Sequence, residues 1–162
     1  MLASWSERSP IVAAMLNPAL VAAVLVTTAD GYHKESGTGV PWMLSFVVAP
    51  MVLHRGTREA LPSTTKTHLA TWVSRHPVLR AGFPLRAQGL VEPVREGIRF
   101  GLAHEVLRLE NDRLLAQPRS RPRGFRSPKD LEDILRKANL VGRWLAKTDS
   151  PATIFALLGV AP

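Results

Sequence analysis

The chain has 162 residues, of which 46% are hydrophobic and 21% are charged, so it can bury one sizeable core and is too short for two comfortable domains. It contains no cysteine, which excludes a disulfide framework and a thiolate metal site, and we expect a cytoplasmic protein. The net charge of +8 is uneven, because two basic residues lie among positions 1–54 and nineteen among positions 55–162.

Residues 9–29 carry no charge over 21 positions, which is the length of a membrane-spanning helix. Asn17 and Pro18 divide this stretch, because asparagine is typical of an N-cap and proline of the first helical position. We therefore predict no membrane segment but a helix from residue 18 to about residue 32, buried on several sides.

A second apolar stretch, VPWMLSFVVAPMVLH, begins at Val40. Proline is tolerated in a first turn, so we predict a helix from residue 41 to about residue 54, kinked or restarted at Pro50. Its 15 residues fall short of the roughly 20 that a bilayer core requires, so we interpret it as a buried helix with Met43 and Phe46 in the core.

Polar residues follow this stretch abruptly. Glu59 lies four positions after Arg55, the spacing of a helical ion pair, and we regard Arg55 and Arg58 as candidate partner contacts. A different class of function is an enzyme in which His54 and Glu59 form an acid/base pair beside a cationic clamp.

The segment 63–104 predicts further helices. Hydroxyl groups at residues 63–65 are suitable caps for a helix that ends before Pro77 and has one apolar face, formed by Leu69, Trp72 and Val73. From residue 78 to about residue 104, Pro84 and Pro93 are expected to bend the chain or divide it into two helices. The apolar stripe of this region consists of Leu90, Val94, Ile98 and Leu102.

The hydrophobic period changes at residues 106–117, where two short apolar segments flank Asn111 and Asp112. This pattern predicts a β-hairpin. Helices at 66–76 and 78–104 followed by this hairpin have the outline of a winged-helix module. We therefore predict a mainly α fold with a small β-hairpin, in which residues 1–117 form a winged-helix-like helical core.

Residues 118–129 are predicted to form a basic linker rich in proline and arginine. Its segment RSRPRGFRSPK has five positive charges and no acid, so it can contact nucleic-acid phosphates or an acidic partner. The candidate residues for this contact are Arg119, Arg121, Arg123, Arg126 and Lys129.

Residues 130–162 are predicted to be a C-terminal helical extension that packs on the core or on a partner. An amphipathic helix is followed by a short apolar helix that Ser150 caps and Gly159 ends. Because this last helix is apolar and terminal, we regard Phe155 and Leu158 as candidate partner contacts.

The sequence satisfies no catalytic template. It has no glycine-rich phosphate loop, no HExxH and no GxSxG, and its five histidines are isolated in sequence. We therefore expect a protein that is not an enzyme and that holds neither a metal nor a cofactor.

Several phrases in order along the chain resemble the middle-component family of three-component ABC systems. They are NPAL, GYH, GVPWMLSFVVAPMVLH, REALP, TWVSRHP and LRLENDRLLA, within residues 15–117. The resemblance implies a non-enzymatic subunit that acts between an effector, such as a nuclease, and an SMC-like ABC ATPase related to double-strand-break-repair ATPases. Such systems, Lamassu-type ones included, act in bacterial defence against phages and plasmids.

The leading hypothesis is thus an accessory subunit that bridges the ATPase and the effector and aids engagement of double-stranded DNA through the complex, without a membrane. The alternative is a stand-alone winged-helix regulator. Such a regulator would bind one duplex sequence by itself, with an affinity that falls steeply as salt rises.

Overall fold

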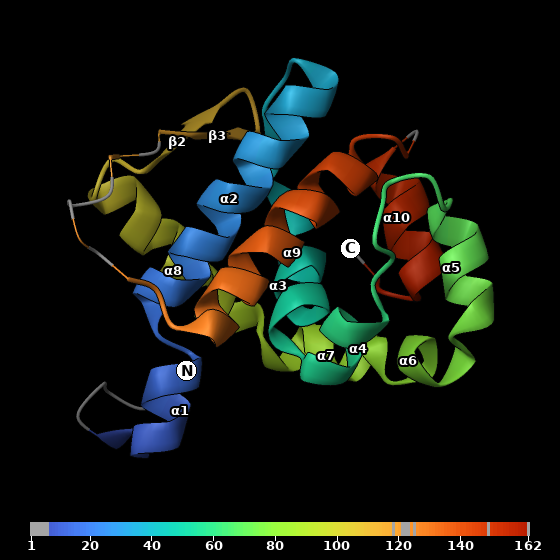
Figure 1. Cartoon of the computed structure of the whole chain (residues 1–162), viewed down its shortest axis with the longest axis horizontal. Coiled ribbons are helices and arrows are strands. Elements are labelled where there is room, and N and C mark those ends of the chain that lie inside the picture. Colours follow the sequence, from blue (N-terminus) through green and yellow to red (C-terminus); the bar gives the residue numbers. More distant parts are fainter. Residues whose placement is uncertain (1–6, 118, 121–123, 125, 149, 162) are drawn as a thin grey trace.

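The structure is a computed structural model that describes residues 7–117, 119–120, 124, 126–148 and 150–161. Its helices are α1 (Pro10–Met15), α2 (Pro18–Ser36), η2 (Trp42–Leu44), α3 (Ser45–Leu53), α4 (Arg55–Ala60), α5 (Leu69–Arg75), α6 (Pro77–Ala81), α7 (Phe83–Gly89), α8 (Val91–Ala103), α9 (Lys129–Leu145) and α10 (Pro151–Leu158). The strands β1 (Val40–Pro41), β2 (Leu107–Glu110) and β3 (Arg113–Ala116) form one small antiparallel sheet. The prediction of a mainly helical fold is confirmed (Figure 1).

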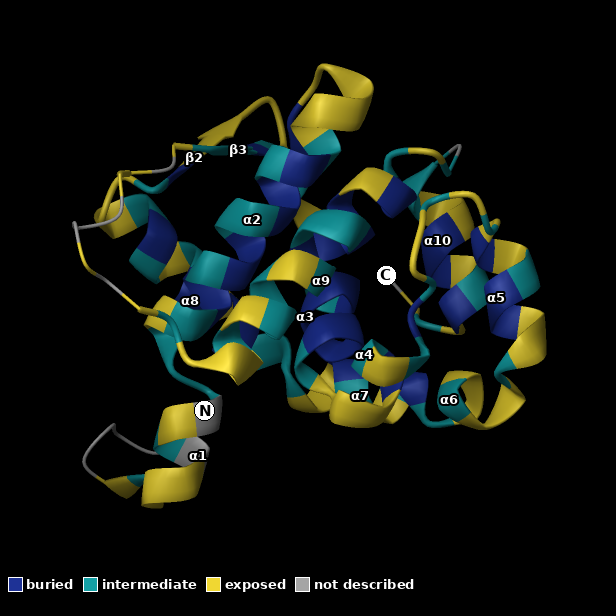
Figure 2. Ribbon diagram, viewed as in Figure 1, coloured by how far each residue is buried: buried dark blue, intermediate teal, exposed yellow. Residues whose placement is uncertain are grey.

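Helix α2 begins as the sequence predicts. The side chain of Asn17 accepts a hydrogen bond from the Ala19 amide at 2.8 Å, and Pro18 occupies the first turn. The helix ends at Gly37, whose φ of 74° is left-handed, and so extends four residues beyond the predicted residue 32. It packs most extensively on α9 and α8, and Figure 2 shows the buried residues where these helices meet α3.

The contact between α2 and α9 depends on Gly142. A Cβ atom at this position would lie 2.9 Å from the Tyr32 amide nitrogen and would overlap the carbonyl oxygen of Thr28. Only a residue without a side chain therefore lets the two helix backbones approach this closely.

The predicted start of the second helix is wrong. Val40 and Pro41 form strand β1 instead, because they pair with Leu114 and Arg113 of β3. Proline is tolerated there since β1 is an edge strand. Helix α3 then runs through Pro50 to Leu53 without restarting.

Burial of the opening residues of this stretch also differs from the prediction. Met43 is 38% exposed, so its assignment to the core is wrong, and Phe46 is half-buried. The residues that fill the core come later, in α3, from Val47 to Val52. The reason is that η2 turns Trp42 and Met43 toward the surface, whereas its last residue, Leu44, is fully buried and leads into α3.

The helices between residues 63 and 104 are partly as predicted. Helix α5 buries Leu69, Trp72 and Val73 on one face, but it begins after His68 and not at residues 63–65. The region 77–104 contains three helices, α6, α7 and α8, instead of two. Proline lies in the first turn of each and so starts these helices instead of interrupting them.

The predicted β-hairpin is confirmed, with Glu110 opposite Arg113. Asn111 and Asp112 have φ values of 48° and 59°, as a tight two-residue turn requires. Strand β3 also pairs with β1, so the sheet order is β1-β3-β2, and the third strand was not predicted. The winged-helix arrangement is not confirmed.

Helices α9 and α10 pack against the rest of the chain. Helix α9 lies along α2 and buries Trp144 and Leu145, and α10 contacts α5. Ser150 caps α10 by accepting a hydrogen bond from the Thr153 amide at 3.2 Å, as predicted. In the described part of the chain, no helix combines the length and apolar character needed to span a bilayer.

Candidate functional site

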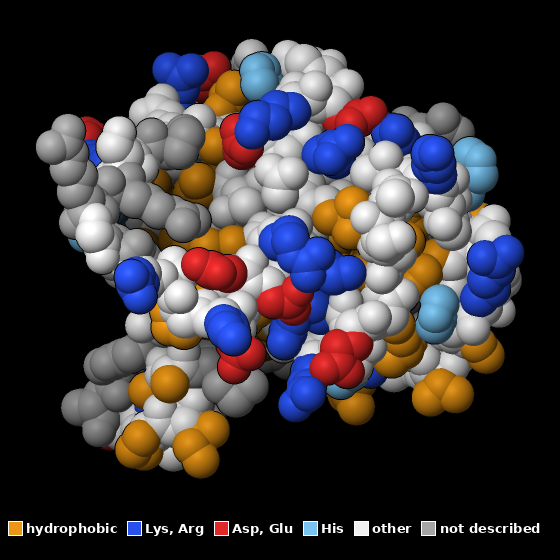
Figure 3. Space-filling model, viewed as in Figure 1, with side chains coloured by type: hydrophobic (Ala, Val, Ile, Leu, Met, Phe, Trp, Pro, Cys, Tyr) orange, Lys and Arg blue, Asp and Glu red, His pale blue; other side chains and the backbone are white. Residues whose placement is uncertain are grey.

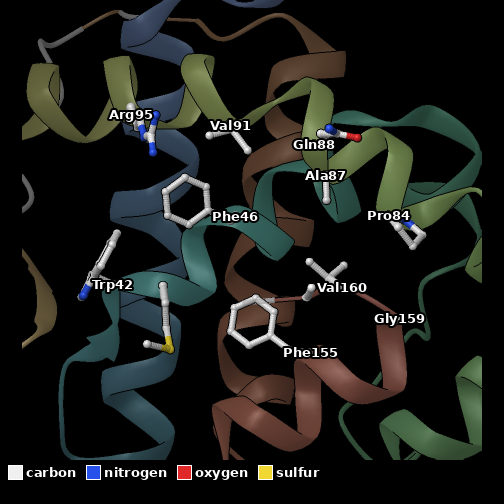
Figure 4. A pocket seen from close by; sticks show the side chains of 12 residues that line it. Trp42, Phe46, Pro84, Ala87, Gln88, Val91, Arg95, Phe155, Gly159 and Val160 are labelled. Carbon is white, nitrogen blue, oxygen red and sulfur yellow. The ribbon is translucent and has the colours of Figure 1, made fainter.

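An open apolar pocket of about 690 Å³ lies among the described residues (Figure 4). Four segments enclose it: η2 with the start of α3, helix α7, helix α8, and the end of α10 with the residues that follow. The lining residues are Trp42, Met43, Phe46, Pro84, Ala87, Gln88, Val91, Arg95, Phe155, Gly159, Val160 and Ala161. We call this hollow the docking pocket.

Trp42 and Met43 form one side of the docking pocket. The amide of Trp42 donates to the carbonyl of Asp112 at 3.1 Å, which ties η2 to the turn of the β-hairpin. The Trp42 ring meets Phe46 edge to face, with centroids 5.8 Å apart. Trp42 and Met43 are each 38% exposed, so this side presents large apolar groups to the solvent.

The opposite side of the pocket is formed by α7 and the C-terminal segment. Phe155 points into the pocket from α10 and is only 5% exposed. Gly159 has a φ of 72°, which turns the chain back so that Val160 also reaches the lining. Arg80 donates to the Leu157 carbonyl at 3.1 Å and ties α6 to the end of α10.

The chemistry of the docking pocket suits apolar ligand groups. Arg95 is its one charged lining residue, is half exposed, and is ion-paired with Glu92 of the same helix. Among the residues that the structure describes, no three His, Cys, Asp or Glu side chains gather where they could hold a metal ion. The lining therefore offers burial of side chains and not a constellation for acid/base or nucleophilic chemistry.

The structure separates the two C-terminal residues that the sequence analysis singled out. Phe155 lines the docking pocket, whereas Leu158 is fully buried in the core. Leu158 is therefore not on the surface of the folded chain.

The two arginines after α3 have different environments. Arg55 is 82% exposed and pairs with Glu59 at 2.7 Å, as predicted from their spacing. Arg58 is largely buried: it donates to the Val52 carbonyl at 2.8 Å and pairs with Asp133 of α9 at 3.2 Å. Arg55 thus has an exposed side chain on the surface, and Arg58 joins α3, α4 and α9.

His54 is the N-cap of α4. Its Nδ1 accepts a hydrogen bond from the Thr57 amide at 3.1 Å, which satisfies a free donor of the first turn. Burial lowers the pKa of His54, and the nearby charges of Arg86 and Arg58 lower it further. His54 thus contacts Thr57 while Glu59 contacts Arg55, so the structure shows no bond between the two residues of the suggested acid/base pair.

The basic segment is described only in part. Arg119 is exposed and pairs with Glu105 of the loop before β2 at 3.3 Å. Lys129 is exposed at the start of α9, Arg126 is exposed three residues before it, and Arg121 and Arg123 lie outside the described residues. Figure 3 shows basic and acidic side chains interspersed on the face that contains α9.

The sequence analysis missed most of the pocket. Trp42, Met43 and Pro84 were assigned to helices, and only Phe155 was named as a contact. A usable signal was the close spacing of Trp42, Met43 and Phe46, since tryptophan, methionine and phenylalanine are enriched at interfaces.

Fold and site together define a small, mainly helical protein with a three-stranded sheet and an open apolar pocket. A family model described as ABC-three component (ABC-3C) system Middle Component 3 matches residues 5–162. The chain therefore belongs to this family of middle components. Comparison with curated proteins and with solved structures found no match.

Proposed function

We propose that this middle component is a non-catalytic adaptor that joins the SMC-like ABC ATPase of its system to the effector. In this proposal, an apolar segment of one of these components inserts into the docking pocket. The observation that carries the proposal is the pocket itself, an open hollow lined by Trp42, Met43 and Phe46. Tryptophan, methionine and phenylalanine are enriched at the centres of protein interfaces.

The remaining surface supports a second contact. Arg55 is exposed, held in place by Glu59, and lies on α4, outside the pocket lining. An adaptor needs two separate surfaces, and the pocket and Arg55 supply candidates for them. Arg55 can form an ion pair with an acidic residue of the second component.

Co-purification of the tagged chain with the other components of its system tests the adaptor proposal. We expect the wild-type chain to retain the ATPase and the effector, and Met43→Asp to lose one of them, because a carboxylate on the pocket rim opposes apolar docking. Val78→Asp is the matched control, since Val78 is 83% exposed and does not line the pocket. If Met43→Asp still retains both components, the pocket is not the docking site. If the wild-type chain retains neither component, the adaptor proposal is wrong.

Engagement of DNA is a further part of the proposal. In a winged-helix module, a helix, a short strand, two helices and a hairpin follow one another, and the short strand pairs with the second hairpin strand. The order α2, β1, α3, α8, β2, β3 and the pairing of β1 with β3 support such an arrangement, with α4 to α7 as an insertion. Helix α8 then corresponds to the helix that approaches the duplex, and Arg99 is exposed on it.

The same topology favours the second candidate, a stand-alone winged-helix regulator. The two candidates differ in what they bind: a regulator alone binds one duplex sequence, whereas an adaptor needs its complex. Replacing Arg119, Arg121, Arg123 and Arg126 with alanine is expected to weaken DNA binding and to leave assembly intact. Unchanged DNA affinity would exclude the basic segment as a phosphate contact.

The system in which this adaptor acts is proposed to be a Lamassu-type defence against phages and plasmids. The measurement is the efficiency of phage plating on cells that carry the complete system. We expect Met43→Asp to abolish protection and Val78→Asp to keep it. Equal plating of a panel of phages on cells with and without the wild-type system would contradict a role in defence against phages.

A further inference from the structure

Helix α1 leaves an apolar surface uncovered. It lies outside the helical body, and Figure 2 shows its ribbon largely exposed. Ile11 is 72% exposed, and Pro10 and Ala14 are exposed as well, at positions that share one helical face. In Figure 3, hydrophobic side chains gather on the surface where Figure 1 shows α1. We call residues 9–17 the N-terminal arm.

The N-terminal arm is attached to the body at both of its ends. Before the arm, the two terminal guanidinium nitrogens of Arg8 donate to the Glu96 carboxylate of α8 at 3.0 and 2.7 Å, and the Arg8 side chain is only 7% exposed. After the arm, Asn17 caps α2. A bidentate pair of this kind fixes orientation as well as distance, so the exposed face of the arm has a defined position.

The base of the arm and the lining of the docking pocket meet at neighbouring positions of α8. Glu96, which binds the base of the arm, directly follows Arg95, which lines the pocket. The arm has no charged residue from position 9 to position 17, so none of its side chains would carry a charge into an apolar lining.

We propose that the N-terminal arm of one copy occupies the docking pocket of a second copy, so that the chain alone forms a reciprocal dimer. In a two-fold dimer the same two surfaces contact each other twice, and here the base of the arm and the pocket lining both contact or include α8, through Glu96 and Arg95. This inference concerns the chain without its system. Since it uses the pocket of the proposed adaptor function, a docking component would displace the arm.

Cross-linking between introduced cysteines tests the dimer. The chain contains no cysteine of its own, so only the introduced ones can react. One variant carries Ile11→Cys and a second carries Gln88→Cys, a replacement of an exposed lining residue. We expect a 1:1 mixture treated with a short bis-maleimide to form a covalent heterodimer, identified by mass spectrometry. The control mixture of Val78→Cys with Gln88→Cys should form at least about tenfold less covalent heterodimer, since only random collisions bring those two positions together.

Two results would overturn the proposal. One is a yield of heterodimer no greater than that of the control mixture. The other appears in a chain that carries both Ile11→Cys and Gln88→Cys: cross-linking within one chain, giving a modified monomer, means that the arm occupies its own pocket.

Variants without cysteine separate this proposal from the adaptor function. Ile11→Asp is expected to weaken self-association about tenfold or more in sedimentation equilibrium, while the other components are still retained. Met43→Asp is expected to lose both interactions. If Ile11→Asp leaves self-association unchanged, the arm does not make this contact. If, in that case, Met43→Asp still loses the other components, the adaptor function remains supported.

Discussion

Trp72 of α5 and Trp144 of α9 meet edge to face, with ring centroids 5.7 Å apart and planes at 88°. Both indole N–H groups donate to backbone carbonyls at the ends of one irregular connection. Trp72 binds the carbonyl of Ala60 at 2.8 Å, and Trp144 binds that of Thr67. The two rings therefore join α5 to α9 and hold the connection between α4 and α5 at both ends.

Trp144→Phe is expected to lower the free energy of unfolding by about 1–3 kcal/mol, because the part-buried Thr67 carbonyl loses its donor. Urea denaturation followed by circular dichroism measures this as a lower midpoint at constant slope. Trp42→Phe is the matched control: Trp42 is 38% exposed, and the change should stay within about 0.5 kcal/mol. Equal losses in the two variants would contradict a structural role of the tryptophan pair.

Gly142→Ala is expected to cost about 2 kcal/mol or more in unfolding free energy. The added Cβ would meet the Thr28 carbonyl, and backbone atoms of α2 cannot rotate away as a side chain can. Gly89→Ala serves as the control, because a Cβ there has no neighbour within 4 Å. That control should be neutral or stabilising by up to about 1 kcal/mol, so similar melting curves for the two variants would exclude the close helix contact.

The two arginines after α3 should respond differently to substitution. Arg58→Met is expected to lower stability by about 1–3 kcal/mol, since the Val52 carbonyl and Asp133 lose their largely buried partner. Arg55→Glu should not change the unfolding midpoint, because the side chain is 82% exposed, but it should weaken retention of a partner component. Denaturation measures the stability of both variants, and co-purification measures their retention of the partner component. A loss of stability in Arg55→Glu but not in Arg58→Met would contradict this assignment.

Protonation of His54 should lower stability. Its pKa is lowered in the folded chain, so the unfolded state takes up the proton first as pH falls. The stabilisation is therefore complete above the ordinary histidine pKa of about 6.5 and is lost as pH falls through the lowered folded value. We expect His54→Asn, which keeps a capping side chain without this titration, to lose less stability than the wild type between about pH 7 and 5. Parallel pH profiles would contradict the prediction.

Local patterns identified much of this fold. Asn17 with Pro18 marked the start of α2, Asn111 with Asp112 marked the hairpin turn, and Ser150 marked α10, because capping and turn chemistry act within a few residues. Arg55 and Glu59 pair for the same reason. The sequence also excluded a disulfide framework, since there is no cysteine to form one.

Only the tertiary structure decided what the stretch after Gly39 does. Pro41 was compatible both with a first helical turn and with an edge strand, and pairing with Arg113, 72 positions away, selected the strand. That choice turned Trp42 and Met43 outward, where they line the docking pocket together with Phe155 and Val160 from the other end of the chain. A pocket built from distant segments leaves no local pattern, because each of its side chains obeys the period of its own element. The tertiary structure alone therefore assembled the candidate docking pocket and buried Leu158, while sequence alone sufficed for the helices and turns whose signals are local.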